Sequence, residues 1–415
     1  MRKLIIAALL FMGVHAVSQQ VYRTQVFQPA VKTLQIGLMG QRFVLPVLQL
    51  NSSEKLLVSF DEMSHDAHSY SYRVIHCNAD WTQSSLNTGE YLAGFPTSTI
   101  TDAQVSLNTT FLYTHYAFNL PNDDMSFKVS GNYVVQIYED NQQDTPIAQA
   151  CFSIVEPHVS ISAKVRGNTD TELSGALQQL DFDLNFGGYT VRDPGTEIKV
   201  TVRQNNRIDN EVRDLQPTYY GAGKLSYINN KALIFDGGTE YHRFDISNVY
   251  AAGAGLDRIK YNRPHYEAYL NEDRIMADKP YQQDMDVNGK FVINLQSSDA
   301  DSIEADYMYV HFFLPTKNPF FDGQLYLGGG FNHNLMNETN RMKYDGETGM
   351  YYQTILLKQG GYNYQYWFVP KSDQKATTRR VDGSYWQTQN EYTIYVYHRA
   401  WGERYDKLIG VKDLE

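Results

Sequence analysis

Two short segments of this chain carry side chains of the kinds that bind metal ions. The first contains His65 and His68, three residues apart, followed by His76, Cys77 and Asp80. Imidazole, thiolate and carboxylate groups are the ligands that zinc prefers. The two leading histidines fall in a turn, however, and His76 and Cys77 point to opposite faces of one strand. We therefore expect hydrogen-bonded histidines at these positions and no metal ion.

The second segment, Asp284, Asp286, Asn288 and Gly289, matches the opening of a calcium-binding loop. That loop needs a bidentate glutamate near its end, where this chain has Leu295. The Asn-Gly pair readily adopts the positive φ angles of a tight two-residue turn. We therefore expect a hairpin at this point and no calcium ion.

Motifs for catalysis are missing from the sequence. Gly253-Ala254-Gly255 lacks the third glycine and the strand-to-helix context of a dinucleotide-binding fingerprint. Neither a nucleophile elbow nor a phosphate loop occurs. We therefore expect no catalytic residue, no cofactor and no small-molecule substrate. A glycosidase is an alternative, because it needs only two carboxylates close together, and spacing along the sequence does not reveal such a pair.

The composition restricts where the protein acts and what it binds. The chain has 36 basic and 47 acidic residues and a formal net charge of −11. Such a surface repels phosphate backbones and anionic lipid, so we expect neither nucleic acid binding nor direct membrane insertion. Residues 1–18 have the features of a secretory signal peptide, with Arg2 and Lys3 before a short apolar run. That run is too short to span a bilayer, and the mature chain is expected in the periplasm.

Cys77 and Cys151 are the two cysteines of the chain. This number excludes a disulfide scaffold and leaves the core to hydrophobic burial. The alternation of their neighbours places both on solvent-facing sides of strands. Two alternatives stay open at this point, a single disulfide or two free, half-buried thiols.

Short alternating runs separated by turns predict an all-β protein, and the 32 tyrosines and 20 phenylalanines favour sheets as well. Near the N-terminus, residues 56–60 and 70–77 are predicted as two strands that form a hairpin. Residues 133–137 and 148–154 predict another pair. The first unit ends near Glu156, because the proline that follows cannot donate to a central ladder.

Two further units show the same alternation. Strands are predicted at 159–165, 180–186 and 198–202 in a middle unit, and at 307–313, 323–327 and 360–366 in a C-terminal unit. A short helix is predicted at 171–180. The expected architecture is three consecutive immunoglobulin-like β-sandwich domains. Their expected bounds after the signal peptide (1-18) are 19-156, 157-305 and 306-415.

The C-terminal unit resembles immunoglobulin-like early-set domains of the glycogen-binding type. The resemblance rests on the pattern Gly323 to Leu327, Gly330-Phe331-Asn332 and Gly360 to Tyr366. Such modules bind glucans through stacking tryptophans. Where a tryptophan often follows Phe-Asn in them, this chain has His333 and Asn334. The resemblance implies the fold, and a glycan-binding exported β-sandwich protein is the alternative function.

The stretch from Tyr70 to Phe95 is the most distinctive part of the chain, because an alternating strand leads into a polar, turn-rich loop with apolar anchors such as Trp81. In order and spacing it resembles the plug protein family of the type IX secretion system of Bacteroidetes. The same resemblance includes Asn108, Thr109, Tyr113 to Tyr116, Pro121 and Ser130 to Tyr133. It covers essentially the whole mature chain. It implies a periplasmic protein that binds the periplasmic end of the outer-membrane translocon barrel and closes it when no substrate is passing.

The sequence does not identify the residues that contact such a barrel. Two hypotheses are the loop around Trp81 and the glycine-rich connection from Tyr250 to Asp257. Burial of Trp81 in its own core is the competing explanation for the first. We expect many polar contacts and scattered tyrosines at the interface, because the partners must also exist apart.

Overall fold

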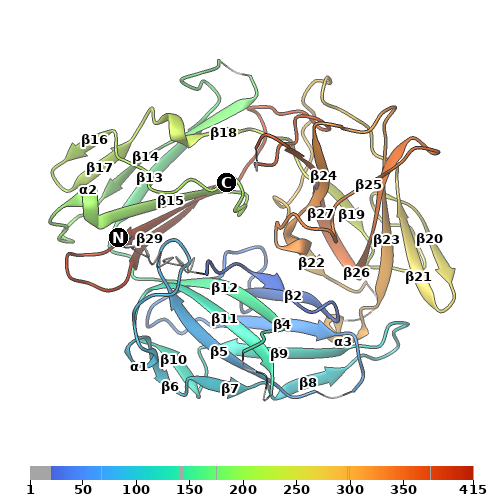
Figure 1. Ribbon diagram of the computed structural model, residues 1–415, viewed down its shortest axis with the longest axis horizontal. Coiled ribbons are helices and arrows are strands. Elements are labelled where there is room, and N and C mark those ends of the chain that lie inside the picture. The colour runs from blue at the N-terminus through green and yellow to red at the C-terminus, as the bar shows by residue number, and fades with distance from the viewer. Residues whose placement is uncertain are drawn as a thin grey trace, which may run out of the picture.

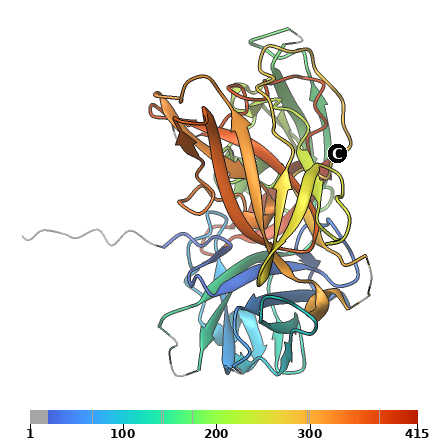
Figure 2. The same cartoon turned by 90° about the vertical axis from the view of Figure 1, so that its right-hand side faces the viewer.

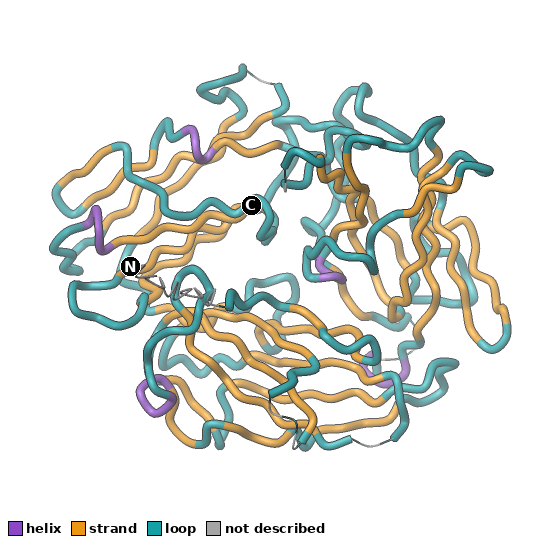
Figure 3. The backbone as a smooth tube through the Cα atoms, viewed as in Figure 1, coloured by secondary structure: helices purple, strands orange, loops and turns teal. Residues whose placement is uncertain are grey.

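The computed structural model describes residues 20–414, with gaps at 67, 141, 143, 174, 297, 299 and 374. Three β-sandwiches surround a common centre (Figure 1), and strands make up most of the regular backbone (Figure 3). Seen from the side, the first sandwich lies below the other two (Figure 2). The all-β class predicted from the sequence is confirmed. The expected signal peptide at 1–18 lies outside the described residues.

The first sandwich contains two facing sheets and a small ribbon. One sheet has the order β1 (Gln25–Val26), β12 (Ala148–Val155), β11 (Gly131–Glu139), β5 (Tyr70–Cys77) and β7 (Thr97–Thr99), with β3 (Val47–Gln49) parallel to β12. The other has the order β2 (Val31–Leu38), β4 (Leu56–Glu62), β9 (Thr114–Leu120) and β8 (Asp102–Val105). The ribbon of β6 (Leu92–Gly94) and β10 (Met125–Phe127) and the helix α1 (Thr88–Tyr91) complete it. Alternate apolar side chains of both sheets form one core.

The hairpin predicted between β4 and β5 is wrong, because the two strands lie in opposite sheets. β4 pairs with β2 and β9, whereas β5 pairs with β11 and β7. Each strand buries apolar side chains, so its pattern identifies the strand without identifying its neighbour. The other predicted pair is confirmed by the antiparallel ladder between β11 and β12.

The second sandwich combines strands from the middle of the chain with its last two strands. One sheet has the order β13 (Ser160–Arg166), β14 (Leu177–Asn185), β17 (Lys224–Tyr227) and β16 (Tyr219–Gly221), and β18 (Ile234–Asp236) also pairs with β14. The other has the order β15 (Ile198–Gln204), β28 (Tyr392–His398) and β29 (Lys407–Leu414). Two single-turn helices, α2 (Pro194–Glu197) and η1 (Lys231–Leu233), lie in the connections.

The third sandwich is built from the residues between β18 and β28. One sheet has the order β19 (His242–Asp245), β27 (Gly360–Pro370) and β22 (Phe291–Ile293), and β24 (Gly323–Gly328) also pairs with β27. The other has the order β20 (Leu256–Asn262), β21 (His265–Leu270), β23 (Tyr307–Pro315), β26 (Met350–Lys358) and β25 (Lys343–Asp345). The short helices α3 (Asp301–Glu304) and η2 (Gly330–Asn332) belong to its loops. None of the described helices is long and apolar enough to cross a membrane.

The third sandwich is therefore an insertion into the second, and the expected bounds 157-305 and 306-415 do not follow the sheets. β19 to β22 pair within the third sandwich, whereas β28 and β29 return to pair with β15. The cause of the difference lies in β28, whose residues are all buried. Tyr392, Ile394 and Val396 join the second core, while Tyr395 and Tyr397 pack against the first sandwich. A strand covered on both faces carries no alternation that would reveal its sheet.

Two local predictions also differ from the structure. Residues 177–180, predicted as helix, begin β14 because they pair with β13 and β18. Asn288 and Gly289 do form a tight turn, with φ angles of 52° and 82°. β22 follows this turn, but residues 271–290 contain no strand before it, so it does not connect a paired hairpin.

Candidate functional site

The side chains that suggested a zinc site have separate structural partners. Nε2 of His65 lies 2.9 Å from Oγ of Ser106, and Nδ1 of His68 lies 2.6 Å from a carboxylate oxygen of Glu62. His76 is buried, with Nε2 3.1 Å from a backbone carbonyl, and burial lowers its pKa to about 4. Within the described residues, no group of three or more histidine, cysteine or acidic side chains could hold a metal ion.

The polar residues of the other motifs stabilise turns. Asp80 accepts hydrogen bonds from the backbone and the hydroxyl of the residue two positions later, at 3.0 and 2.6 Å. Asp286 accepts one from the N–H of Asn288 at 3.0 Å, and the exposed Asp284 lies 3.3 Å from an arginine. Gly255 has a φ of 74° in the turn before β20. These contacts account for the residues as local structure.

Both cysteines are free thiols in this structure. The prediction that they lie on solvent-facing sides of strands is wrong. Cys77 is fully buried and Cys151 partly buried, and both pack in a small apolar cluster with Trp81 and Val134. Burial raises the pKa of the Cys77 thiol and raises that of Cys151 to about 12. Both are therefore small apolar side chains rather than nucleophiles.

The two segments suggested as contacts for a partner differ in exposure. Trp81 is only 7% exposed, and the guanidinium of Arg203 in β15 lies 5.7 Å from the centre of its ring. Trp81 is thus a contact between the first and second sandwiches. Tyr250, in contrast, is 89% exposed. The segment before β20 therefore presents an aromatic side chain to solvent.

A cluster of buried charges joins the first sandwich to the third. Asp61 in β4 is 1% exposed. Its carboxylate lies 2.6 Å from Nζ of Lys358 in β26 and 2.6 Å from Nδ1 of His115 in β9, and the hydroxyl of Tyr307 in β23 donates to it at 2.7 Å. Burial lowers the pKa of Lys358, against the opposing attraction of Asp61. We call Asp61, His115, Tyr307 and Lys358 the Asp61 cluster.

A second buried carboxylate joins the first sandwich to the second. Asp406, in the loop before β29, is 1% exposed. It lies 3.0 Å from Nζ of Lys199 and 2.9 Å from Nε of Arg399. It also accepts a hydrogen bond at 2.9 Å from the backbone N–H of Ala79, in the polar loop after β5. The distinctive loop of the sequence is therefore held against the C-terminal strands.

Arg207 connects the second sandwich to the third. Its guanidinium lies 4.6 Å from the centre of the Trp367 ring in β27 and donates to the carbonyl of Ala376 at 2.9 Å. It also lies 2.6 Å from the carboxylate of Asp209. Breaking a buried ion pair leaves an uncompensated charge, which costs several kcal/mol. The Asp61–Lys358 pair crosses its interface directly. Asp406 and Arg207 are paired within the second sandwich and cross their interfaces by hydrogen bonds with the backbones of Ala79 and Ala376.

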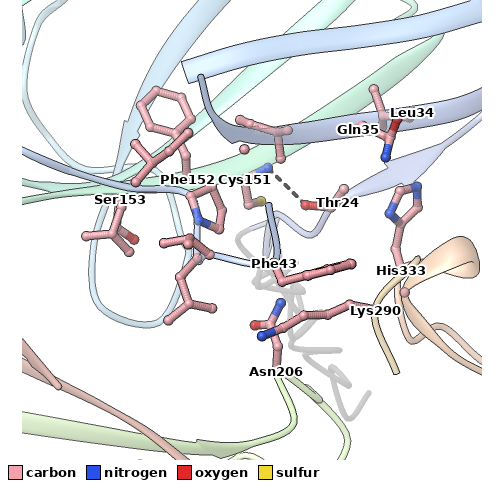
Figure 4. Close-up of a pocket in the computed structure, with 18 of the residues that line it drawn as sticks. Thr24, Leu34, Gln35, Phe43, Cys151, Phe152, Ser153, Asn206, Lys290 and His333 are labelled. Atoms are coloured by element: carbon pink, nitrogen blue, oxygen red, sulfur yellow. Dashed lines mark hydrogen bonds between the residues drawn. The ribbon is translucent and has the colours of Figure 1, made fainter. Parts of the chain in front are cut away.

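A cavity of about 720 Å³ lies where the three sandwiches meet. The first sandwich contributes β2, the following segment 39–46 and Trp81 to its wall. The second contributes Arg203, Asn206 and Tyr395, and the third contributes β22, Lys290 and His333. Figure 4 shows Phe43, Asn206, Lys290 and His333 around this space, with β2 side chains above them. The cavity exists only when all three sandwiches are assembled.

The lining of this cavity suits binding. Burial lowers the pKa of His333 to about 4, so its imidazole is uncharged at neutral pH. The described lining contains no aspartate or glutamate, so it lacks the paired carboxylates of a glycosidase. Apolar, aromatic and cationic side chains dominate instead. His333 and Asn334, which occupy the positions where a glucan-binding module often has tryptophan, both face this cavity.

Sequence reasoning missed the Asp61 cluster and the cavity. Asp61 directly follows the apolar run of β4, and Lys358 ends the apolar run of β26. A charged residue inside a buried strand is rare unless it is paired, and this was the available signal. The sequence could not show that Lys358 pairs with Asp61, because the two residues meet only across the interface.

Comparison with known proteins gives two matches. Residues 31–156, which contain most of the first sandwich, match the family model described as Type 9 secretion system plug protein 1st domain. A crystal structure of a hypothetical protein from Parabacteroides merdae has 42% sequence identity and a TM-score of 0.93. The similarity covers 95% of this chain and 100% of that one, and so includes all three sandwiches. No curated protein matches the chain.

Proposed function

The chain belongs to the type IX secretion plug family, and from this premise we propose that it is the periplasmic plug of the type IX secretion translocon. In this role it binds the periplasmic end of the outer-membrane translocon barrel and closes the barrel when no substrate is passing. The observation that carries the proposal is the match of the first sandwich to the first domain of the family.

The buried polar contacts between the sandwiches support a blocking role. A plug has to keep its shape against whatever presses on it from the pore. The carboxylates of Asp61 and Asp406 and the guanidinium of Arg207 each make a buried polar contact across one interface between sandwiches. Separation of the first and third sandwiches would leave Asp61 without Lys358. Separation at the other two interfaces would break buried hydrogen bonds of Asp406 and Arg207, so opening is disfavoured at all three interfaces.

The exposed tyrosines support reversible binding. Tyr250 and Tyr261 of the third sandwich are 89% and 53% exposed. A tyrosine combines a large apolar ring with a polar hydroxyl, so it contributes contact area without making the free protein insoluble. Such a surface fits a plug that has to leave the barrel when a substrate passes.

The proposal is tested by affinity purification of the tagged mature chain from detergent-solubilised outer membrane, followed by mass spectrometry. We expect the translocon barrel to be the main partner recovered. Deletion of the gene should also increase the uptake of a small dye that the outer membrane normally excludes. Absence of the barrel from the purified complex, together with unchanged dye uptake, would contradict the proposal.

A variant pair tests the contact segment at Tyr250. Tyr250→Glu places a charge at an 89% exposed ring, and Tyr219→Glu makes the same change at a 63% exposed ring of the second sandwich. The few residues that dominate an interface are often tyrosines, and altering one of them costs about 2 kcal/mol or more of binding, which is about thirtyfold in affinity. We expect Tyr250→Glu to lower recovery of the barrel and Tyr219→Glu to retain it. Recovery with Tyr250→Glu as high as with the unaltered chain would place the contact elsewhere.

A further inference from the structure

Two unpaired strand edges border the central cavity. β2 is the terminal strand of its sheet and pairs only with β4 among the described strands, and its residues 34–38 line the cavity. β22 is likewise terminal, pairing with β27, and all three of its residues line the same cavity. An exposed edge presents backbone N–H and C=O groups that an added strand can pair with. The cavity therefore suits an extended chain better than a compact molecule.

The wall of the cavity carries a surplus of positive charge. Its described cationic residues are Arg23, Arg42, Arg203, Arg213 and Lys290, and it has no acidic residue, although the chain as a whole has a net charge of −11. Glu211 pairs with both Arg203 and Arg213, and Glu391 pairs with Lys290. Three of the five cations are thus paired with carboxylates outside the lining, and two are not. Arg23 and Arg42 are exposed and form no ion pair with any described residue.

Apolar side chains lie beside these charges. Met39, Phe43 and Val44, in the segment that follows β2, line the cavity and remain 57%, 40% and 47% exposed. Leu57, in the strand next to β2, also lines it at 39% exposed. Apolar groups left in contact with water at a concave site gain free energy when a ligand covers them. A fitting ligand thus combines apolar and negatively charged groups.

We propose that the central cavity binds an extended segment of a partner polypeptide in which apolar and acidic residues alternate, and that this segment adds as a strand to the free edge of β2. The alternation follows from strand geometry, because successive side chains of the added strand point to opposite sides. The apolar side chains cover the 39–44 segment, and the carboxylates face the arginines. A segment of about five residues spans about 17 Å, which matches the exposed edge of β2. This inference concerns the cavity alone and does not depend on the proposed plug function.

The probe is a fluorescein-labelled heptapeptide of alternating valine and glutamate, titrated with the full mature chain and followed by fluorescence anisotropy. We expect saturable binding that weakens as salt rises, because exposed charges are screened. Heptapeptides that alternate valine with glutamine or with lysine should bind at least about tenfold more weakly, which corresponds to about 1.4 kcal/mol. Equal binding of all three peptides, or no binding of the glutamate peptide, would overturn the proposal.

Two double variants with the same change in net charge test the location. Arg23→Glu with Arg42→Glu alters the cavity, whereas Arg274→Glu with Lys343→Glu alters exposed residues that do not line it. We expect the first pair to weaken binding of the glutamate peptide at least about tenfold and the second pair to leave it within about twofold. An equal effect of the two pairs would mean that the peptide responds only to net charge, and would refute the cavity as the site.

Backbone pairing is tested separately from side-chain contact. A glutamate peptide with N-methyl groups on alternate residues keeps its side chains but cannot donate along one edge. It should bind at least about tenfold more weakly than the parent peptide. Hydrogen exchange should also slow at residues 34–38 when the parent peptide is bound. Unchanged affinity after N-methylation, with no added protection in β2, would refute strand addition. Because the assay contains no barrel, failure of the plug proposal would leave this result unaffected.

Discussion

Replacing Lys358 by methionine is expected to destabilise the joint between the first and third sandwiches. Lys358 is 2% exposed, and its Nζ lies 2.6 Å from the carboxylate of Asp61. At that distance and an effective dielectric constant of about 20, the attraction amounts to about 6 kcal/mol. Part of it is offset by the cost of removing the ammonium group from water. Methionine leaves Asp61 buried without that counter-charge, so the free energy of unfolding should fall by about 3–5 kcal/mol.

The measurement is urea unfolding of the Lys358→Met variant, followed by fluorescence, with limited proteolysis to detect opening at the joint. Lys343→Met is the matched control, because Lys343 is exposed on β25 of the same sheet. That change should alter the free energy of unfolding by no more than about 0.5 kcal/mol. The double variant Asp61→Asn with Lys358→Met should lose at least about 2 kcal/mol less than the sum of the single variants. If Lys358→Met lowers the free energy of unfolding by less than about 1 kcal/mol, the Asp61 cluster does not stabilise the interface between the first and third sandwiches.

Four further predictions follow from single residues. Gly131→Ala should lower the free energy of unfolding by about 1–3 kcal/mol in urea unfolding, because Gly131 has a φ of 138° and an added Cβ would lie 2.4 Å from Nε2 of His76. Burial lowers the pKa of His76 to about 4, so the unfolded chain takes up the proton first. The free energy of unfolding should therefore fall by about 2 kcal/mol between pH 7.5 and 5, and His76→Gln should flatten this dependence. A thiol reagent at neutral pH should label Cys77 far more slowly than the same thiol in the unfolded chain, and Cys151 should be similarly slow, because burial raises both pKa values. Calorimetric titration with a linear α-glucan should give no heat of binding, because His333 stands where a stacking tryptophan would be needed; measurable binding would favour the glycan alternative.

The positions of most strands could be predicted from the sequence, because the period-two pattern is local. β5, β11, β12 and β23 all lie at the expected residues. Which strands pair with one another was harder to predict. The pattern of β4 indicates only that one of its faces is buried. No local feature therefore distinguishes a hairpin between β4 and β5 from a crossover of the chain to the opposite sheet.

The candidate site was the least predictable part of the molecule. Trp81 was recognised as an anchor, but its position between two sandwiches depends on Arg203, which lies far away in the sequence. The cationic residues of the cavity are also scattered along the chain, and nothing in the spacing of Arg23, Arg42 and Lys290 suggests that they share one wall. Proximity of this kind arises only from the packing of whole domains.

Residue types and spacing within short segments were enough to predict the all-β class, most strand positions and the resemblance to the plug family. The folded chain was needed to show that the third sandwich is an insertion and that β28 returns to the second. It also decided that Asp61 meets Lys358 and that a positively charged cavity forms at the centre. The physical reason is that strand pairing and charge pairing depend on distances in space, and several segments have to be folded before those distances are set.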